Sequence, residues 1–209
     1  MLKRLGFLFI VIFLAGCAHY QSVQIPPRMD LSHSKSIGII EFSSIGTAAL
    51  GPYATQEFIH QIQRAQPGTR FVELGTKEQV LSSVGRHEID LEAIRLVGNK
   101  FNVDLLATGA TEVSEIKTDF RFSTELTVKA EANVRISLSA KLWETASAAT
   151  VWTDAAGEEC PVVQLGLSSQ GKTSVGIKDP ETKYGKIIAG PVHCLTPDFM
   201  PRYTRKRID

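Results

Sequence analysis

The clearest pattern along the chain is a strict alternation of apolar and polar residues from Leu126 to Leu142. Every even position in these seventeen residues is apolar, and every odd position is polar or charged. Successive side chains of a β-strand point to opposite faces, so the pattern predicts one strand with a buried face and a solvent-exposed face. Strands usually have about five or six residues, so one end of this strand is expected to extend beyond the domain.

Shorter elements precede and follow the long strand. Apolar runs predict strands at 36–42, 71–74, 103–110 and 149–155, with a turn between 118 and 123. Apolar residues at helical spacing predict helices after Pro52, after the capping-box pair Thr76 and Gln79, and after the capping residue Asp90. This order predicts an α+β fold, with a mixed/antiparallel sheet, helices packed on one face, and a long antiparallel β-meander in the C-terminal half.

The N-terminus carries an export signal. Two cations precede an apolar run from Leu5 to Ala15, which is too short to span a bilayer and ends in small residues. The sequence Leu-Ala-Gly-Cys that ends at Cys17 resembles the lipobox of bacterial lipoproteins. The resemblance implies cleavage before Cys17 and covalent lipid on that residue. Ala18 is not the Asp that favours retention in the inner membrane, so the implied location is the outer membrane, lipid-anchored and periplasm-facing. The alternative is an ordinary signal peptide in which Cys17 is incidental.

Charge and length limit the remaining possibilities. Removal of residues 1–17 leaves 21 of the 23 basic residues against 22 acidic ones, a net charge of −1 that gives no indication of nucleic-acid binding. We expect a flexible tether at 18–34, one periplasmic α/β domain at 35–158, and a C-terminal extension at 159–209. Apart from the lipid on Cys17, no cofactor or metal is expected.

Two cysteines remain after cleavage, Cys160 and Cys194. The periplasm permits disulfides, so we predict that they pair and close the C-terminal extension. Metal binding by Cys160, His193 and Cys194 is the alternative, but this set has no clear fourth ligand and no paired spacing.

The extension also contains a phosphate-loop pattern and a basic tail. Gly166 to Thr173 matches G-x-x-x-x-G-K-T, but Gly176 and Pro180 oppose the helix that should follow, so nucleotide binding is a remote alternative. The tail is predicted to be a solvated terminus, and contact of its cations with an anionic surface is the alternative. Its four cations are Arg202, Arg205, Lys206 and Arg207.

The region from about 37 to 155 resembles a group of cell-envelope proteins. The resemblance rests on the opening run 37–42, the helix with Phe58 and Ile62, the stretch 93–109, and a closing signature. That signature falls on Leu142, Glu144, Ser147, Ala148 and Trp152, with Glu, Ser and Ala in the places of Asp, Thr and Gly. The group contains the curli-secretion channel lipoprotein, the amino-terminal domain of the Tol-system β-propeller protein, and the lipoprotein activators of penicillin-binding proteins. It implies a scaffold, activator or pore of the envelope and no enzyme.

The functional hypothesis is a non-enzymatic outer-membrane lipoprotein that serves an envelope protein complex as an assembly factor, activator or scaffold. The alternative is an oligomeric secretion-channel (pore) subunit of the curli-channel type. Phe120, Phe122 and Leu126, near the surplus end of the long strand, are the predicted contacts with the partner protein or with a homo-oligomer. No catalytic residue is predicted, because the histidines His33, His60 and His87 have no Ser, Asp or Cys at meaningful spacing.

The lipobox generates the first testable prediction. Cys17→Ser removes the only residue to which the lipid can be attached, so the variant should lose both lipid labelling and membrane attachment. Fractionation of cells and the mass of the purified protein measure the two effects. Continued outer-membrane fractionation of the variant would contradict the lipoprotein assignment.

Overall fold

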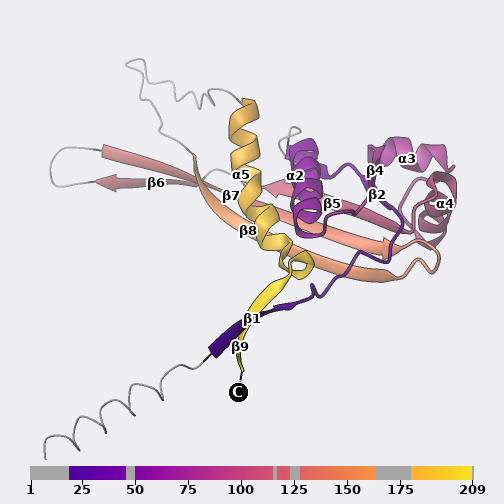
Figure 1. Cartoon of the computed structure of the whole chain (residues 1–209). Coiled ribbons are helices and arrows are strands. Elements are labelled where there is room, and N and C mark those ends of the chain that lie inside the picture. The colour runs from indigo at the N-terminus through magenta and orange to yellow at the C-terminus, as the bar shows by residue number, and fades with distance from the viewer. Residues whose placement is uncertain (1–18, 46–49, 115–116, 123–127, 163–179, 209) are drawn as a thin grey trace, which may run out of the picture. The chain divides into compact units, whose positions relative to one another are not determined.

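The computed structural model describes residues 19–45, 50–114, 117–122, 128–162 and 180–208 (Figure 1). The chain forms two compact units, one from the segments at its two ends and the other from Arg28–Met200, which we call the body. The signal peptide at 1–17, with Cys17, and the phosphate-loop pattern at 166–173 lie outside the described residues. Those assignments stay predictions.

The first half of the body is a parallel sheet built by two crossovers. Strand β2 (Ile37–Ile40) lies between β4 (Phe71–Gly75) and β5 (Leu105–Val113) and is parallel to both, and the short β3 (Ser43–Ile45) also pairs with β5. Helix α2 (Leu50–Ala65) leads from β2 to β4, whereas α3 (Lys77–Ser83) and α4 (Leu91–Phe101) lead from β4 to β5. Connections between parallel strands are right-handed. The chain crosses the sheet in one direction from β2 to β4 and in the other from β4 to β5, so α2 lies on one face and α3 and α4 lie on the opposite face.

Two hydrophobic clusters confirm this division. Ile39 belongs to the cluster beneath α2, and its neighbour Ile40 belongs to a second cluster with Val80 of α3 and Val97 of α4. Neighbouring strand residues point to opposite faces, so the clusters lie on the two sides of the sheet. The α+β class and the mixed sheet are confirmed, and the structure adds that the helices cover both faces rather than one.

Strand β7 (Val128–Glu144) is the long strand predicted from the alternation. It pairs antiparallel with β5 and β6 (Lys117–Phe122) along one edge, and with β8 (Thr150–Val162) along the other. The predicted turn between 118 and 123 is wrong over residues 118–122, because these belong to β6. The apolar face of β7 is buried beneath α2 and α5 through Ile136, Leu138, Ala140 and Leu142.

The C-terminal region adds a helix that was not predicted. Helix α5 (Pro180–Leu195) and the 3-10 turn η1 (Pro197–Phe199) lie on the same face as α2 and place four residues in the core: Ile188, Val192, Leu195 and Phe199. Leu31, from the predicted tether, belongs to the same cluster. The predicted boundaries at 34/35 and 158/159 therefore differ from the structure, in which the body runs from Arg28 to Met200.

One side chain joins the two outlying segments to α2. The Gln66 amide donates hydrogen bonds to the carbonyl oxygens of Met29 at 2.7 Å and Phe199 at 3.0 Å, and its Oε1 accepts the Leu31 N–H at 2.8 Å. Phe199 also packs edge-on against Trp152, with 4.8 Å between ring centroids, and against Phe58 at 6.1 Å. These contacts make the segments on either side of the predicted domain part of one core.

Local signals in the sequence are reproduced at the helix starts. Thr76 and Gln79 form the predicted capping box, and the Asp90 carboxylate accepts the Ala93 N–H at 2.7 Å. That hydrogen bond and one from Arg86 hold the pKa of Asp90 below its ordinary value. In the turn after β7, Ala148 has φ +58°, a left-handed conformation, in the place where the resembling family has glycine.

The second unit is a two-stranded antiparallel ribbon of β1 (His19–Ile25) and β9 (Arg202–Ile208). We call it the terminal ribbon. The predicted flexible tether is thus wrong for residues 19–25, which pair residue by residue with the C-terminal strand. Seven consecutive pairs run from His19 with Ile208 to Ile25 with Arg202.

The core position of Phe199 generates the second prediction. Phe199→Ala should lower the free energy of unfolding by about 3–5 kcal/mol, because it removes a ring that is 0 % exposed from the aromatic cluster. Urea denaturation followed by circular dichroism measures the change. Leu91→Ala, at a position 63 % exposed, is the control and should stay within about 0.5 kcal/mol. A similarly small change for Phe199→Ala would show that the C-terminal segment is no part of the core.

Candidate functional site

The first candidate surface is the projecting part of β7. Residues 128–133 of β7 pair with β6, and Figure 1 shows both segments extending beyond the helices of the body. We call β6 and residues 128–133 the arm. The arm contains the positions of two predicted partner contacts, Phe120 opposite Ala130 and Phe122 opposite Val128. The side chains of Phe120 and Phe122, and the whole of Leu126, lie outside the described residues, so their contacts stay predictions.

The register gives the arm two different faces. Paired residues of an antiparallel ladder lie on the same face, and successive residues alternate between faces. One face therefore carries positions 118, 120, 122, 128, 130 and 132, which are Thr, Phe, Phe, Val, Ala and Ala. The other face carries Lys117, Asp119, Arg121, Lys129, Glu131 and Asn133. The arm is thus an amphipathic two-stranded ribbon.

The second candidate is a groove of about 300 Å³ on the sheet face opposite α2 and α5. The exposed Lys77, at the start of α3, and Lys141 of β7 both line it. The Lys141 ammonium lies 5.6 Å from the centre of the Trp143 ring, a distance that permits a cation–π interaction. Hydroxyl side chains from four segments complete the lining: Ser43, Thr108, Ser139 and Thr153.

The groove has a mixed polar and apolar lining. Its described lining contains one carboxylate, Glu41, and neither histidine nor cysteine. The resolved pKa shifts all lie elsewhere, at Asp30, Glu78, Arg86 and Asp90. Sequence reasoning missed this groove, although the polar odd positions of the long strand, Ser139 and Lys141, marked one wall of it.

Among the described side chains, no group of three or more His, Cys, Asp or Glu residues is arranged to hold a metal ion. In the part of the chain that the structure describes, no helix combines the length and apolarity needed to span a membrane.

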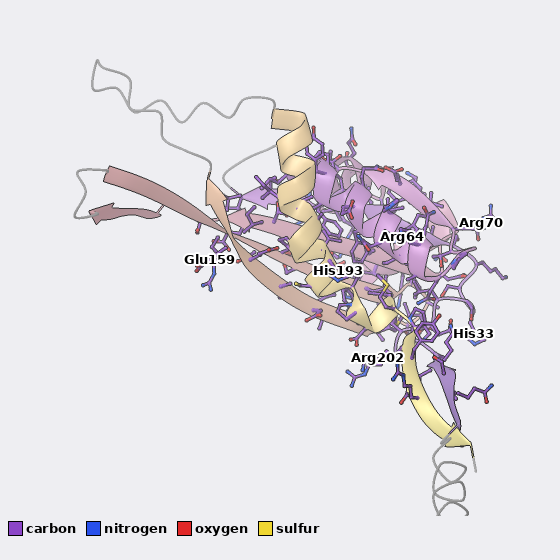
Figure 2. All side chains as sticks on the ribbon, turned by 60° about the vertical axis from the view of Figure 1, so that its left-hand side comes forward. His33, Arg64, Arg70, Glu159, His193 and Arg202 are labelled. Atoms are coloured by element: carbon purple, nitrogen blue, oxygen red, sulfur yellow. The ribbon has the colours of Figure 1, made fainter. Side chains whose placement is uncertain are left out.

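The basic tail is the third candidate surface, and it lies in strand β9 of the terminal ribbon. Arg202, Arg205 and Lys206 are exposed, and Arg207 is the residue paired with Tyr20 (Figure 2 labels Arg202). The tail is therefore a paired strand whose described cations are exposed, and its pairing places Arg205, Lys206 and Arg207 beside residues 20–22.

The predicted pairing of Cys160 with Cys194 meets an unfavourable backbone arrangement. Gly190 of α5 packs so closely on Glu158 of β8 that an added Cβ would lie 1.8 Å from the carboxylate. After Gly190, α5 continues to η1, where Phe199 contacts Trp152 near the start of β8. After Glu158, β8 continues in the opposite direction, toward Cys160. Figure 2 shows the preceding residues, Glu159 and His193, at separate places along β8 and α5.

These positions give an estimate of the separation. Cys194 lies one helical turn past Gly190, and Cys160 lies two strand residues past Glu158. Because the two elements run in opposite directions, these displacements add to about 12 Å. A disulfide needs Cα atoms about 4.4–6.8 Å apart. The Cys194 thiol is exposed and free in the structure. The side chain of Cys160 lies outside the described residues, so the pairing stays a prediction.

Comparison with known proteins finds distant structural similarity only. Neither a family model nor a curated protein matches the chain. The structure is similar to the PelC dodecamer from Paraburkholderia phytofirmans, with a TM-score of 0.44 and 11% identity over 88% of this chain and 99% of that one. It is also similar to the LpoB C-terminal domain from Salmonella enterica, with a TM-score of 0.38 and 10% identity over 63% and 87%. Lipoprotein GNA1162 from Neisseria meningitidis has a TM-score of 0.34 and 14% identity over 76% and 96%.

At these identities and TM-scores, the similarities assign neither a family nor a function to this chain. The candidate surfaces therefore rest on its own residues: the amphipathic arm, the groove, and the cationic terminal ribbon.

The cysteine positions generate the third prediction. The separation of about 12 Å estimated above exceeds the reach of a disulfide, so we expect two thiols per chain to react in the lipid-free protein that begins at Ala18, in place of the predicted pairing. Alkylation in denaturant followed by mass measurement counts them, and Cys194→Ser, which should leave one reactive thiol, calibrates the assay. A count of zero before reduction and two after it would establish the disulfide and would require α5 to be placed differently against β8.

Proposed function

We propose that the chain is a non-enzymatic outer-membrane lipoprotein that acts in the periplasm as an assembly factor, activator or scaffold by binding another envelope protein through the arm. The observation that carries the proposal is the register of β6 with β7, which gathers Phe120 and Phe122 on one face with Val128 and Ala130. The lipobox at Cys17 supports the envelope location.

The apolar face of the arm has a physical need for a cover. A two-stranded ribbon on its own is marginally stable in water, and a third strand or a packed surface is usually required. Among the described strands, β6 pairs with β7 alone. Its second edge therefore offers backbone N–H and C=O groups to which an extended segment of a partner can add, while the apolar face supplies side-chain contacts.

The charged face of the arm favours a specific partner over general adhesion. Asp119 lies opposite Glu131, and Arg121 lies opposite Lys129. Like charges directly opposite each other destabilise a ladder, typically by a few tenths of a kcal/mol. A partner with complementary charges at these positions would remove that cost, so binding and ordering of the arm are expected to reinforce each other.

The same edge also suits the alternative, an oligomeric secretion-channel subunit, because a second copy of the chain can supply the added strand. The two functions differ in what covers the arm: another envelope protein in the first case, and an identical chain in the second.

Site-specific crosslinking in cells tests the proposal and generates the fourth prediction. A photoreactive phenylalanine analogue in place of Phe120 or Phe122 should give an adduct with one envelope protein, because both positions lie on the apolar face. The same analogue at Arg121, on the charged face of the same strand, and at the exposed Leu91 of α4 provides matched controls that should give weaker adducts or none. Mass spectrometry of the adducts identifies the partner.

The outcomes separate the hypotheses. Adducts that contain two copies of this chain would support the channel subunit instead. Equal adduct yields from Phe120, Arg121 and Leu91 would contradict any function for the apolar face of the arm.

A further inference from the structure

We propose that the terminal ribbon is a second membrane anchor, whose end inserts among the headgroups of anionic phospholipids beside the lipidated Cys17. The inference rests on the proposed lipoprotein function for the position of Cys17. The ribbon itself is observed, and its affinity for lipid can be measured without the acyl chains.

The pairing register decides where the cations lie. Arg207 is paired with Tyr20, Lys206 with Gln21 and Arg205 with Ser22. Their partners follow Cys17 by three to five residues, which corresponds to at most about 10–17 Å of extended chain. This reach is about one to two Debye lengths at 0.1 M salt, and any bend of the chain shortens it, so Arg207, the cation with the shortest reach, is expected to feel the membrane that holds Cys17 most strongly.

The charge of the ribbon has one sign. Strands β1 and β9 contain four cations from Arg and Lys and no Asp or Glu, and the acid that follows, Asp209, still leaves an excess of three. Residues 21–25 and 202–206 are exposed. Clusters of Lys and Arg next to a membrane anchor bind anionic lipid by summed charge, which indicates a phospholipid surface rather than an acidic pocket of fixed shape.

The alternation along β9 determines how the ribbon meets the membrane. Lys206 lies on one face and Arg205 and Arg207 lie on the other, because successive strand residues alternate. A ribbon lying flat would turn one of these faces away from the lipid. An end-on ribbon places the last three cations in the headgroup layer together, and the chain leading to Cys17 enters at the same end.

This arrangement adds a charge term to the acyl anchor. Stable attachment of a lipidated protein commonly uses two signals, of which a basic cluster is one. Each Lys or Arg near an anionic surface strengthens binding by roughly fivefold, so the loss of two should weaken it roughly 25-fold.

Vesicle sedimentation tests the proposal and supplies the fifth prediction. The lipid-free protein from Ala18, which contains every element that the structure describes, should bind vesicles of phosphatidylglycerol and phosphatidylethanolamine and should not bind vesicles of phosphatidylcholine and phosphatidylethanolamine. Arg205→Gln with Lys206→Gln should weaken binding to the anionic vesicles roughly 25-fold. Arg205→Lys with Lys206→Arg keeps the charge and should bind as the unchanged protein does.

The matched control removes the same charge from the body. Arg64→Gln with Arg70→Gln changes two exposed cations, one in the last turn of α2 and one just before β4 (Figure 2), and should leave vesicle binding within about twofold. Thermal unfolding by circular dichroism verifies that all variants fold.

Three results would overturn the proposal. The first is equal binding to both kinds of vesicle, and the second is an equal loss of binding in the Arg64 and Arg70 control. The third is a loss in the charge-preserving variant, which would show that pairing of the ribbon matters rather than its charge. None of these measurements uses the acyl chains. A failure of the ribbon to bind vesicles can therefore be distinguished from a failure of the lipoprotein assignment, which Cys17→Ser tests.

Discussion

The hydrogen-bond ladder of β7 is the interaction on which the rest of the body depends. Both of its edges are occupied, by β5 and then β6 on one side and by β8 on the other. Its C-terminal half supplies Leu138 and Leu142 to the core, and its N-terminal half forms the arm. A one-residue slip would turn every apolar side chain of β7 to the wrong face, so the register that builds the core also fixes the faces of the arm.

The handedness of chain crossovers explains the arrangement around that ladder. The connection from β2 to β4 and the connection from β4 to β5 cross the sheet in opposite directions. Because both are right-handed, they lie on opposite faces, which puts α2 on one side and α3 with α4 on the other. The α3–α4 pair covers only part of its face. The groove with Lys77 and Lys141 lies beside it, and no local pattern in the sequence could have brought these two lysines together.

Local sequence patterns predicted individual strands and helix starts. They could not predict the pairing of segments that are far apart in the chain. The alternation at 126–142, the capping box at Thr76 and the cap at Asp90 need only a few neighbouring residues. The two caps were confirmed, and the strand was confirmed over its described residues, 128–142. Helix α5 was missed because Pro191 lies inside it, although Ile188, Val192 and Leu195 have helical spacing. The terminal ribbon joins residues almost two hundred positions apart, and neither strand has an apolar face that would reveal it.

The terminal ribbon has a topological consequence for this chain. Because His19 and Ile208 are paired across the ribbon, the described chain is nearly a closed loop. A short linker between these ends, with a new start in an exposed connection of the body, should preserve the fold as a circular permutant. A tag fused after Ile208 would therefore begin beside His19.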